Sequence, residues 1–512
     1  MIALLAGMSI SGCTSKFEDI NTDPNTTTEV TPEMLAEGQI LWLFTEFESE
    51  AEYYMQPYFT NHHIAWLGGD TGSETYNYLG DIDFRRQFSF EYAYKMLNLQ
   101  KMIDACPEDD EETINAYTGV SHFIRAWRFF NMSMSVGDMP YSEALKGEDE
   151  VFDVPYDTQK DIMIGVLEEL DEANELFENA SDFDGDPVYG GDVTKWQKAT
   201  NTLELRILLN LYKKTSDTDL NVISRFKDIV SNRPLMESND DNFELVRSDA
   251  TGQKYPYYKD NNNVIDRDMV TSTVVDSLKS FNDYRLFYFC DMTTAAADAG
   301  ASETSWDSYK GIEQSLTNAE VTAAYQAGEV SGINLRYQEL PEGEPTYLLS
   351  YAEQNFIIAE AIVRGFISGD AESYYQAGIR AAMKFTADVT PDNSDYHHNM
   401  KITDDYINSY LASDKIAFAS TSEEQIKQII VQKYLQGFLQ SNYLGFFEYR
   451  RTGYPEFIIN QATNSNDPAD QMPVRWTYPE NEYSYNRANV LEAVSSQYDG
   501  VDDSNGIMWI LK

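Results

Sequence analysis

Apolar side chains recur at helical spacing in the stretch 347–370, YLLSYAEQNFIIAEAIVRGFISGD. The apolar positions fall at three- and four-residue steps: Leu348, Ala352, Phe356, Ala359, Val363 and Phe366. This spacing predicts an amphipathic helix that ends near Gly365 and Gly369. Asp370 then stands where the N-cap of a second helix belongs. Two helices joined by so short a turn form an antiparallel hairpin, which needs further hairpins to bury its apolar face.

The same pattern covers most of the chain and predicts a mainly α protein. Candidate helices lie at 32–56, 84–105, 112–135, 157–179, 193–214, 219–231, 349–367, 371–388, 403–412 and 422–440. Two further pairs have the hairpin form, 84–105 with 112–135 and 157–179 with 193–214. No period of about 34 residues repeats cleanly, so these are at most divergent tetratricopeptide-like units.

The helical pattern lapses between about 233 and 346. This segment is rich in Asn, Asp, Gly and aromatic residues. A long irregular insertion inside a compact helical protein is usually functional or disordered, and the tyrosines argue against disorder. We therefore expect an ordered, loop-rich insertion with little β structure that faces a ligand.

The chain begins with an apolar, uncharged stretch, MIALLAGMSISG, which runs up to Cys13. Ile10, Ser11 and Gly12 match the aliphatic and small residues that precede a lipidated cysteine, so 1–12 is predicted to be a lipoprotein signal peptide. It lacks the usual basic start, which suggests that the true signal begins further upstream. The alternative is a short apolar terminus with a chance cysteine.

The next residues, 13–31, are polar and contain proline, as expected of a lipid-anchored tether. The rest of the chain, 32–512, is long enough for one very large domain or for two to three ordinary ones. No later stretch reaches the length of about 18 apolar residues that a membrane helix needs. The mature chain is therefore predicted to be anchored by lipid and not to span a membrane.

The acidic composition limits the choice of partners. Asp and Glu number 85 against 37 Lys and Arg, which gives a formal net charge of -48. Such a charge repels polyphosphates, so nucleic acid is excluded as an expected partner. Anionic polysaccharides are disfavoured for the same reason. Besides Cys13, only Cys106 and Cys290 remain, and we expect both to be buried thiols without a required disulfide.

The sequence contains none of the common catalytic motifs, such as GxSxG, HExxH or a P-loop. The histidine pairs His62-His63 and His397-His398 are adjacent in sequence, so their rings diverge on most backbones and a shared metal is not expected. Among 85 acids, no glycosidase dyad stands out. We expect no cofactor.

One acidic loop has partial calcium-loop spacing. Asp182, Asp184 and Asp186 alternate in SDFDGDPVYGGD, but the glycine at position six and the glutamate at position twelve are missing. Calcium is a weak possibility there, and a turn with helix-capping aspartates is the favoured interpretation.

Several ordered motifs resemble one family. They are FEDINTDPN after Cys13, GGDVTKW at 190–196, SYAEQNFIIAEA at 350–361, IIVQKYLQGFLQSNYLGFFEYRRTGYPEF at 429–457 and VRWTYPENE at 474–482. Together they closely resemble the SusD/RagB family of surface-exposed outer-membrane lipoproteins of Bacteroidetes-type bacteria. The resemblance implies tetratricopeptide-like helical hairpins forming a right-handed superhelix, with loop-rich insertions on one side. It also implies a SusC-like TonB-dependent porin as partner, above which the lipoprotein acts as a nutrient-binding lid.

The family motifs also have a structural interpretation. Arg450 and Arg451 follow aromatic residues in a very acidic chain, so we expect them to pair with buried carboxylates rather than to bind a ligand. The segment 474–482 is expected to pack back against the helices.

Aromatic residues in loops are the candidate ligand contacts, because sugars stack their C–H faces on aromatic rings. The candidates are Trp66, Tyr76 and Tyr78 in a glycine-rich stretch, Trp306 and Tyr309 in the insertion, and Tyr257 among three neighbouring tyrosines. Loops of this kind place aromatic rings at the surface. The alternative is that the rings pack the insertion onto the helices.

The favoured function is non-catalytic binding of an oligosaccharide at the cell surface and its delivery to the SusC-like transporter. Peptide binding for the same type of transporter is the first alternative. A surface hydrolase is a more distant one.

Overall fold

The computed structural model describes residues 30–45, 51–67, 90, 95–146, 153–261 and 267–512. Within these ranges the chain is mainly helical, as predicted, and only four short strands are present. The predicted signal peptide, Cys13 and nearly all of the predicted tether lie outside the described residues.

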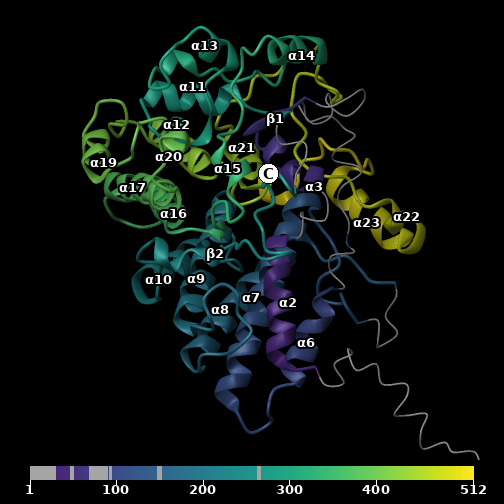
Figure 1. Cartoon of the computed structure of the whole chain (residues 1–512). Helices are drawn as coiled ribbons and strands as arrows, with labels where there is room; N and C mark the ends of the chain where they lie inside the picture. The colour runs from purple at the N-terminus through teal and green to yellow at the C-terminus, as the bar shows by residue number, and fades with distance from the viewer. Residues whose placement is uncertain (1–29, 46–50, 68–89, 91–94, 147–152, 262–266) are drawn as a thin grey trace, which may run out of the picture.

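The helices of the N-terminal half are α2 (Pro32–Thr45), α3 (Ala51–Thr60), α6 (Leu97–Asp104), α7 (Glu111–Val136), α8 (Gln159–Glu178), α9 (Val193–Asn210) and α10 (Val222–Asn232), followed by the 3₁₀ helix η4 (Tyr212–Lys214) between α9 and α10. Most of them form the lower part of Figure 1, whereas α3 lies higher in the picture. The range predicted as one helix at 32–56 contains parts of two, α2 and α3. The helix predicted at 84–105 is described only over α6.

The later elements form the upper part of Figure 1. In the insertion they are η5 (Asn239–Asp241), α11 (Ser272–Phe281), α12 (Leu286–Phe289), α13 (Thr294–Asp298), η7 (Trp306–Ser308), α14 (Asn318–Gln326) and α15 (Arg336–Glu339). The remaining helices are α16 (Tyr351–Val363), α17 (Ala371–Val389), α18 (Ser394–His397), α19 (Asp404–Leu411), α20 (Ser422–Gln436), α21 (Leu444–Thr452), α22 (Glu480–Tyr485), α23 (Arg487–Tyr498) and η8 (Trp509–Leu511). The insertion is thus built of short helices joined by loops. These helices are too short to give a periodic signal in the sequence.

Two small antiparallel sheets attach the insertion to the helices. β2 (Phe243–Leu245) pairs with β4 (Thr346–Leu349), so the two ends of the insertion lie side by side. β1 (Ile64–Trp66), which follows α3, pairs with β3 (Asp268–Val270) inside the insertion. The insertion therefore leaves the surrounding helices and rejoins them at one place.

The helices pack as antiparallel neighbours, most closely α7 with α8 and α16 with α17. Glycines permit this approach, because a Cβ on Gly119 would come within 2.8 Å of the Phe177 ring and one on Gly378 within 2.6 Å of the Phe356 ring. The predicted hairpins of α8 with α9 and of α16 with α17 are confirmed. The predicted pairing of α6 with α7 is minor, because α6 packs mainly against α2 and α7 mainly against α8.

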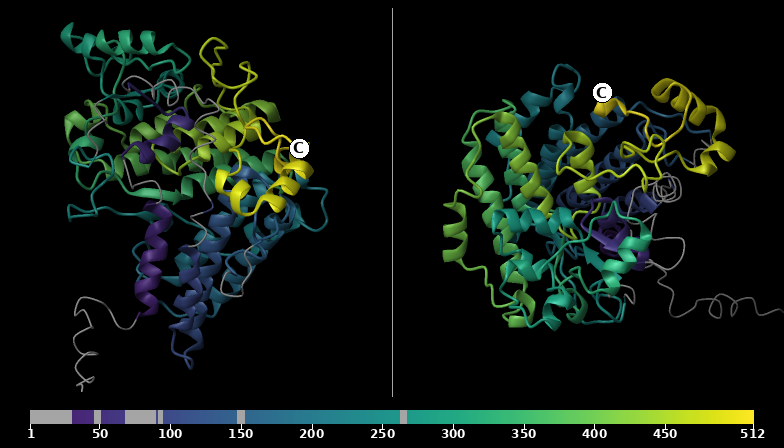
Figure 2. Two further views of the ribbon diagram at one scale, coloured as in Figure 1. Left: turned by 90° about the vertical axis from the view of Figure 1, so that its right-hand side faces the viewer. Right: turned by 90° about the horizontal axis from the view of Figure 1, so that it is seen from above.

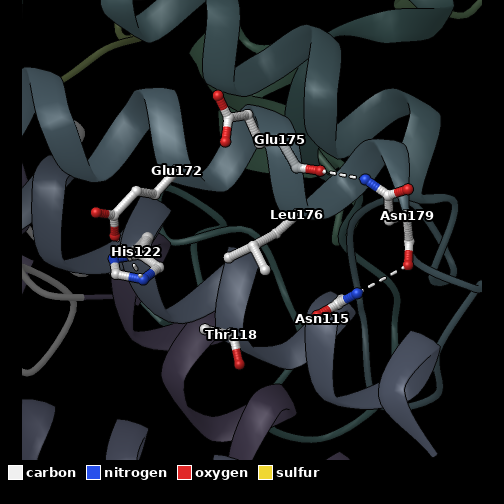
Figure 3. A pocket seen from close by; sticks show the side chains of 7 residues that line it. All are labelled: Asn115, Thr118, His122, Glu172, Glu175, Leu176 and Asn179. Carbon is white, nitrogen blue, oxygen red and sulfur yellow. Dashed lines mark hydrogen bonds and ion pairs between the residues drawn. The ribbon is translucent and has the colours of Figure 1, made fainter.

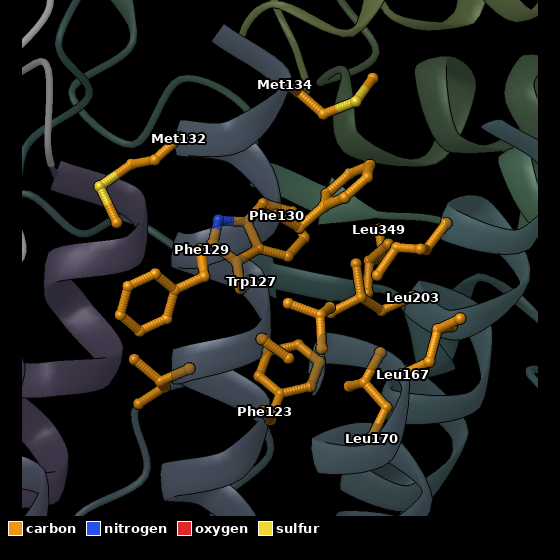
Figure 4. Close-up of a cluster of buried hydrophobic side chains, with 14 of the residues drawn as sticks. Phe123, Trp127, Phe129, Phe130, Met132, Met134, Leu167, Leu170, Leu203 and Leu349 are labelled. Carbon is orange, nitrogen blue, oxygen red and sulfur yellow. The ribbon is translucent and has the colours of Figure 1, made fainter. Parts of the chain in front are cut away.

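Aromatic side chains of α7 fill the core of the lower helices (Figure 4). Phe123, Trp127 and Phe130 lie between α2 and the helices α8 and α9. Leu203 of α9 and Leu349 of β4 close the cluster from the other side. This core therefore reaches the strand at which the insertion rejoins the helices.

A chain of buried charges begins where α9 meets α16. Arg206 of α9 donates to Glu353 of α16, with Nε at 2.8 Å from Oε1 and an Nη at 2.5 Å from Oε2. Lys433 of α20 lies 3.5 Å from the same carboxylate. All three side chains are at least 95% buried. Each charge is matched at close range, which is the condition under which buried ions are tolerated.

The same chain of charges continues into α21. Lys433 contacts Glu448 at 3.0 Å, and Arg451 contacts both Glu448 and Glu360 of α16, the latter at 2.6 Å. Burial favours the neutral acid, but the charge of Arg451 outweighs it and holds the pKa of Glu360 below its usual range. Arg364 adds a further contact to Glu360 at 2.6 Å. We call the seven residues Arg206, Glu353, Glu360, Arg364, Lys433, Glu448 and Arg451 the buried charge chain.

The two adjacent arginines of the C-terminal motif differ in their contacts. The expectation that Arg451 pairs with buried carboxylates is confirmed. The same expectation is wrong for Arg450 within the described residues. Its guanidinium donates to the Val474 carbonyl at 2.9 Å and lies 4.3 Å from the Phe447 ring centroid. Burial lowers the pKa of Arg450 to about 9. Arg450 therefore joins α21 to the closing segment.

The closing segment packs back against the helices as predicted. The Trp476 ring meets Phe446 of α21 edge-on with centroids 5.7 Å apart. Further along, Tyr498 of α23 donates to the Val136 carbonyl at the end of α7, at 2.6 Å. The C-terminal helices thus lie beside the lower helices, as Figure 2 also shows.

We predict that removing one charge from the buried charge chain destabilises the fold strongly. Glu360→Gln leaves Arg451 and Arg364 without their shared carboxylate and should cost about 3–5 kcal/mol in the free energy of unfolding. Urea unfolding measures this. The control is Glu456→Gln, which breaks an exposed pair with Lys427 and should cost at most about 1 kcal/mol. An equal loss of unfolding free energy in the two variants would contradict the importance of the buried charge chain.

Candidate ligand-binding site

Three of the rings predicted to contact ligand are interior. Trp66 is 7% exposed, and Tyr257 and Tyr309 are fully buried. Tyr309 packs edge-on against Phe287 with centroids 5.1 Å apart and donates its hydroxyl to the Glu303 carbonyl at 2.7 Å. The expectation that these three rings lie at the surface is therefore wrong. They fix the insertion to the rest of the molecule, which is the structural alternative considered for them.

Trp66 and Tyr257 are buried by elements distant in sequence. Trp66 belongs to β1, which is paired with β3 of the insertion. Tyr257 faces Tyr58 of α3 with ring centroids 6.4 Å apart. Tyr76 and Tyr78, the other two candidates in the N-terminal stretch, lie outside the described residues.

Trp306 is the candidate ring that the structure leaves partly exposed. It opens the 3₁₀ helix η7, and one edge rests on Phe287 with centroids 4.9 Å apart. Its indole N–H makes no hydrogen bond within the described part of the chain. A polar edge of this ring is thus free to meet a ligand.

Two tyrosines that the sequence analysis did not single out join Trp306. Tyr284 lies 6.2 Å from Trp306, centroid to centroid, and stacks on Tyr406 at 3.8 Å with an interplanar angle of 14°. Both tyrosines are partly exposed. Tyr406 lies on α19 and Tyr284 just before α12, 122 positions apart, so no spacing pattern could have revealed the pair. We call Trp306, Tyr284 and Tyr406 the ring row.

His398 contacts two carboxylates, Asp291 and Glu303, beside the loop that carries Trp306, and we call this arrangement the His398 clamp. The Nε2 of His398 is 3.1 Å from Asp291, and its Nδ1 is 3.6 Å from Glu303. The backbone of His398 is left-handed, with φ +46°, a conformation that costs energy in a residue with a Cβ. The clamp joins the segment after α18 to the loop at 302–309. His397 contacts a different carboxylate, Asp392, at 3.2 Å.

The other histidine pair is interior. His62 stacks on Phe457 with centroids 3.9 Å apart, and His63 lies 4.6 Å from the Tyr434 ring. Burial lowers the pKa of each imidazole to about 3, so both are neutral near pH 7. Within the described residues no group of three or more His, Cys, Asp or Glu side chains is arranged to hold a metal ion.

A polar groove runs between α7 and α8, with a volume of about 440 Å³ (Figure 3). His122 of α7 contacts Glu172 of α8 at 3.4 Å across it. At the other end Asn115 donates to the Asn179 carbonyl at 2.9 Å. Its side chains are carboxylates, amides, the Thr118 hydroxyl and one imidazole over Leu176, and no Phe, Tyr or Trp is among its lining residues.

The comparison with known families identifies the fold. The sequence model of the SusD-like proteins, described as "Starch-binding associating with outer membrane", matches residues 24–479. This chain belongs to the SusD-like family. No similar protein is found among curated sequences.

Solved structures agree with this SusD-like assignment. A SusD homologue from Bacteroides fragilis is 41% identical, with a TM-score of 0.88 over 94% of this chain and all of that one. An outer-membrane protein from Bacteroides vulgatus with a proposed part in nutrient binding is 31% identical, with a TM-score of 0.82. The match covers 94% of this chain and all of that one. A chitin-binding SusD homologue from Flavobacterium johnsoniae, 19% identical, covers 93% of this chain and 98% of its own with a TM-score of 0.74, and shares the fold.

In this SusD-like protein the loop considered for calcium is held by backbone donors. Asp186 accepts hydrogen bonds from the backbone N–H of Val188 at 2.8 Å and of Gly191 at 3.0 Å, and from the Trp196 indole at 2.8 Å. Asp182 accepts from the backbone N–H of Val193 at 3.3 Å. These carboxylates organise the turn before α9, as the favoured interpretation expected.

The two described cysteines are buried and unpaired, as expected. Burial raises the pKa of Cys106 to about 11 and raises that of Cys290 as well. Both thiols of this SusD-like protein are therefore protonated near pH 7. None of the described helices is long and apolar enough to cross a membrane.

We predict that His398 makes stability depend on pH. Burial alone lowers the pKa of His398, but Asp291 and Glu303 outweigh it and raise the pKa above its usual value. The stabilisation is then present below the unfolded value of about 6.5 and is lost as pH rises through the folded one. Urea unfolding at several pH values tests this. His398→Gln should remove the part of the stability that is lost as pH rises. A variant whose unfolding free energy depends on pH as the wild type does would contradict the prediction.

Proposed function

We propose that this SusD-like protein binds a neutral oligosaccharide without catalysis at the cell surface and delivers it to a SusC-like TonB-dependent outer-membrane transporter. The observation that carries the proposal is the family match over residues 24–479. The family description names starch, and one structural neighbour is a chitin-binding protein, so neutral glycans are the favoured ligands. A neutral glycan is also compatible with a net charge of -48, because it has no charge to be repelled.

The protonation states of buried groups support a role without catalysis. The imidazoles of His62 and His63, with pKa values of about 3, are poorly suited to exchange protons near pH 7. The raised pKa values of the Cys106 and Cys290 thiols disfavour them as nucleophiles. Each of these groups is better explained by packing.

The proposal includes a lipid anchor at Cys13. The support is the lipobox-like sequence Ile10-Ser11-Gly12-Cys13 together with the family's association with the outer membrane. An anchor on this residue would leave 14–31 as a tether between membrane and domain. Partnership with a SusC-like transporter rests on the family alone.

Calorimetric titration tests the binding function. The purified chain should give saturable heats with at least one member of a panel of neutral oligosaccharides, including starch- and chitin-derived ones, and none with a peptide mixture. No reducing ends should be released during prolonged incubation. Binding of peptides alone would favour the alternative ligand class, and time-dependent release of reducing ends would favour a hydrolase.

Lipidation is tested separately. With a complete signal sequence restored and a host that processes lipoproteins, the wild-type chain should fractionate with the outer membrane and carry the mass of a lipid group. Cys13→Ala should remove both properties, because the thiol carries the lipid. Ser15→Ala is the matched control and should behave as wild type. Membrane fractionation that survives the Cys13 substitution would contradict the anchor.

A further inference from the structure

A small internal cavity lies between the segment that leads into β1 and the helices α20 and α21. Its lining residues are all buried, and they come from position 63 and from the range 433–448. About 10 Å³ of the cavity is open to the centre of a water molecule. This is enough room for one water molecule and too little for a larger ligand.

His63 brings an unpaired imidazole to the wall of this cavity. Its side chain is 1% exposed, and neither ring nitrogen has a hydrogen-bond partner within the described residues. A backbone group of Tyr434 lies near the ring, but burial outweighs its effect and lowers the pKa of His63 to about 3. The ring is therefore neutral, with one N–H donor and one bare nitrogen that accepts. Because unpaired polar groups in the interior cost free energy, a polar neighbour is expected beside this ring.

Lys433 and Glu448 line the same cavity and have unused hydrogen-bonding capacity. The Lys433 ammonium has three N–H groups, but it has only two acidic neighbours in the described residues, Glu448 at 3.0 Å and Glu353 at 3.5 Å. The two oxygens of Glu448 accept from Lys433 and from Arg451, and each can accept a second bond. The Gln440 amide also lines the cavity, but its oxygen and its nitrogen already make hydrogen bonds elsewhere.

The charges around the cavity select a neutral ligand. A cation would face the Lys433 ammonium, and an anion would face the Glu448 carboxylate. Neither repulsion is screened by solvent in the interior. A water molecule can accept from the ammonium and donate to both a bare imidazole nitrogen and a carboxylate oxygen. Three hydrogen bonds are the usual number for a buried water.

We propose that this cavity is a binding site for one structural water molecule, which accepts a hydrogen bond from Lys433 and donates to His63 and Glu448. The water links the buried charge chain to the segment that leads into β1. The His63 carbonyl accepts the backbone N–H of Thr271, just after β3, at 3.1 Å. The same residue therefore joins the water site to the insertion. The site goes beyond the proposed function and is independent of the ligand that the chain binds.

A crystal structure of the wild-type chain, at a resolution that shows ordered waters, tests the site directly. A single peak should lie between the three side chains, about 2.7–3.2 Å from the atoms that it bonds. Crystals grown with bromide in place of chloride separate water from an anion, because bromide scatters anomalously. A bromide signal, contacts of about 2.0–2.6 Å typical of a metal cation, or no peak beside other ordered buried waters would overturn the proposal.

The two adjacent histidines allow a matched comparison in solution. His62→Phe and His63→Phe add the same volume at buried rings, but His62 does not line the cavity. His63→Phe removes one partner of the water and leaves a Lys433 N–H poorly paired. It should therefore raise the unfolding equilibrium constant, measured with urea, about tenfold more than His62→Phe does.

The opposite order of stability would overturn the water site. Without a bound water, His63→Phe removes only nitrogens that have no partner, so this variant would be at least as stable as His62→Phe. If His63→Phe does not fold, the peak in the wild-type crystal structure decides.

Discussion

The buried charge chain is the constraint on which the arrangement of the helices depends. Glu353 and Glu360 lie seven positions apart on α16, so both point from the same face of one helix. Arg206, Lys433 and Arg451 reach them from α9, α20 and α21. A hydrophobic face tolerates sliding by a fraction of a turn, but a buried charge left without its partner costs several kcal/mol. The chain of charges therefore fixes how four helices are placed relative to one another.

This fixed frame also positions the insertion. β4 leads directly into α16, and β2 pairs with it, so both ends of the insertion are attached at the start of the most constrained helix. Arg206 contributes to this junction as well, because it donates to the Leu348 carbonyl of β4 at 2.6 Å. The buried rings Tyr257 and Tyr309 then attach the insertion from within. Loops on such a support can present rings at the surface without losing their geometry.

The sequence predicted the long helices well because their signals are local. Asp370 caps α17 as expected, accepting the Ser373 backbone N–H at 3.3 Å. The short helices of the insertion were not predicted, since four to ten residues are too few to show a period. Arg450 and Arg451 show a further limit. They are adjacent and chemically identical, but one meets two carboxylates and the other a carbonyl and an aromatic ring, a difference set by tertiary packing.

The candidate site was less predictable for the same reason. Whether a ring is exposed depends on which distant elements cover it, so Tyr309 was expected at the surface and is interior, whereas Tyr406 was overlooked and is partly exposed. Trp306 was predicted from its loop alone to contact ligand, and the structure leaves its ring partly exposed. Family resemblance supplied the fold and the general role, but the ring row emerges only from the packing of η7, α19 and the turn before α12.

The most direct test is hydrogen exchange of the full chain with and without a saturating neutral oligosaccharide. We expect slower exchange on binding in the segments 282–287, 302–309 and 404–411, which carry or adjoin the ring row. We expect no change in α9, α16, α20 and α21, because the buried charge chain already fixes these helices without ligand. Protection confined to those four helices, with the three segments unaffected, would contradict both expectations.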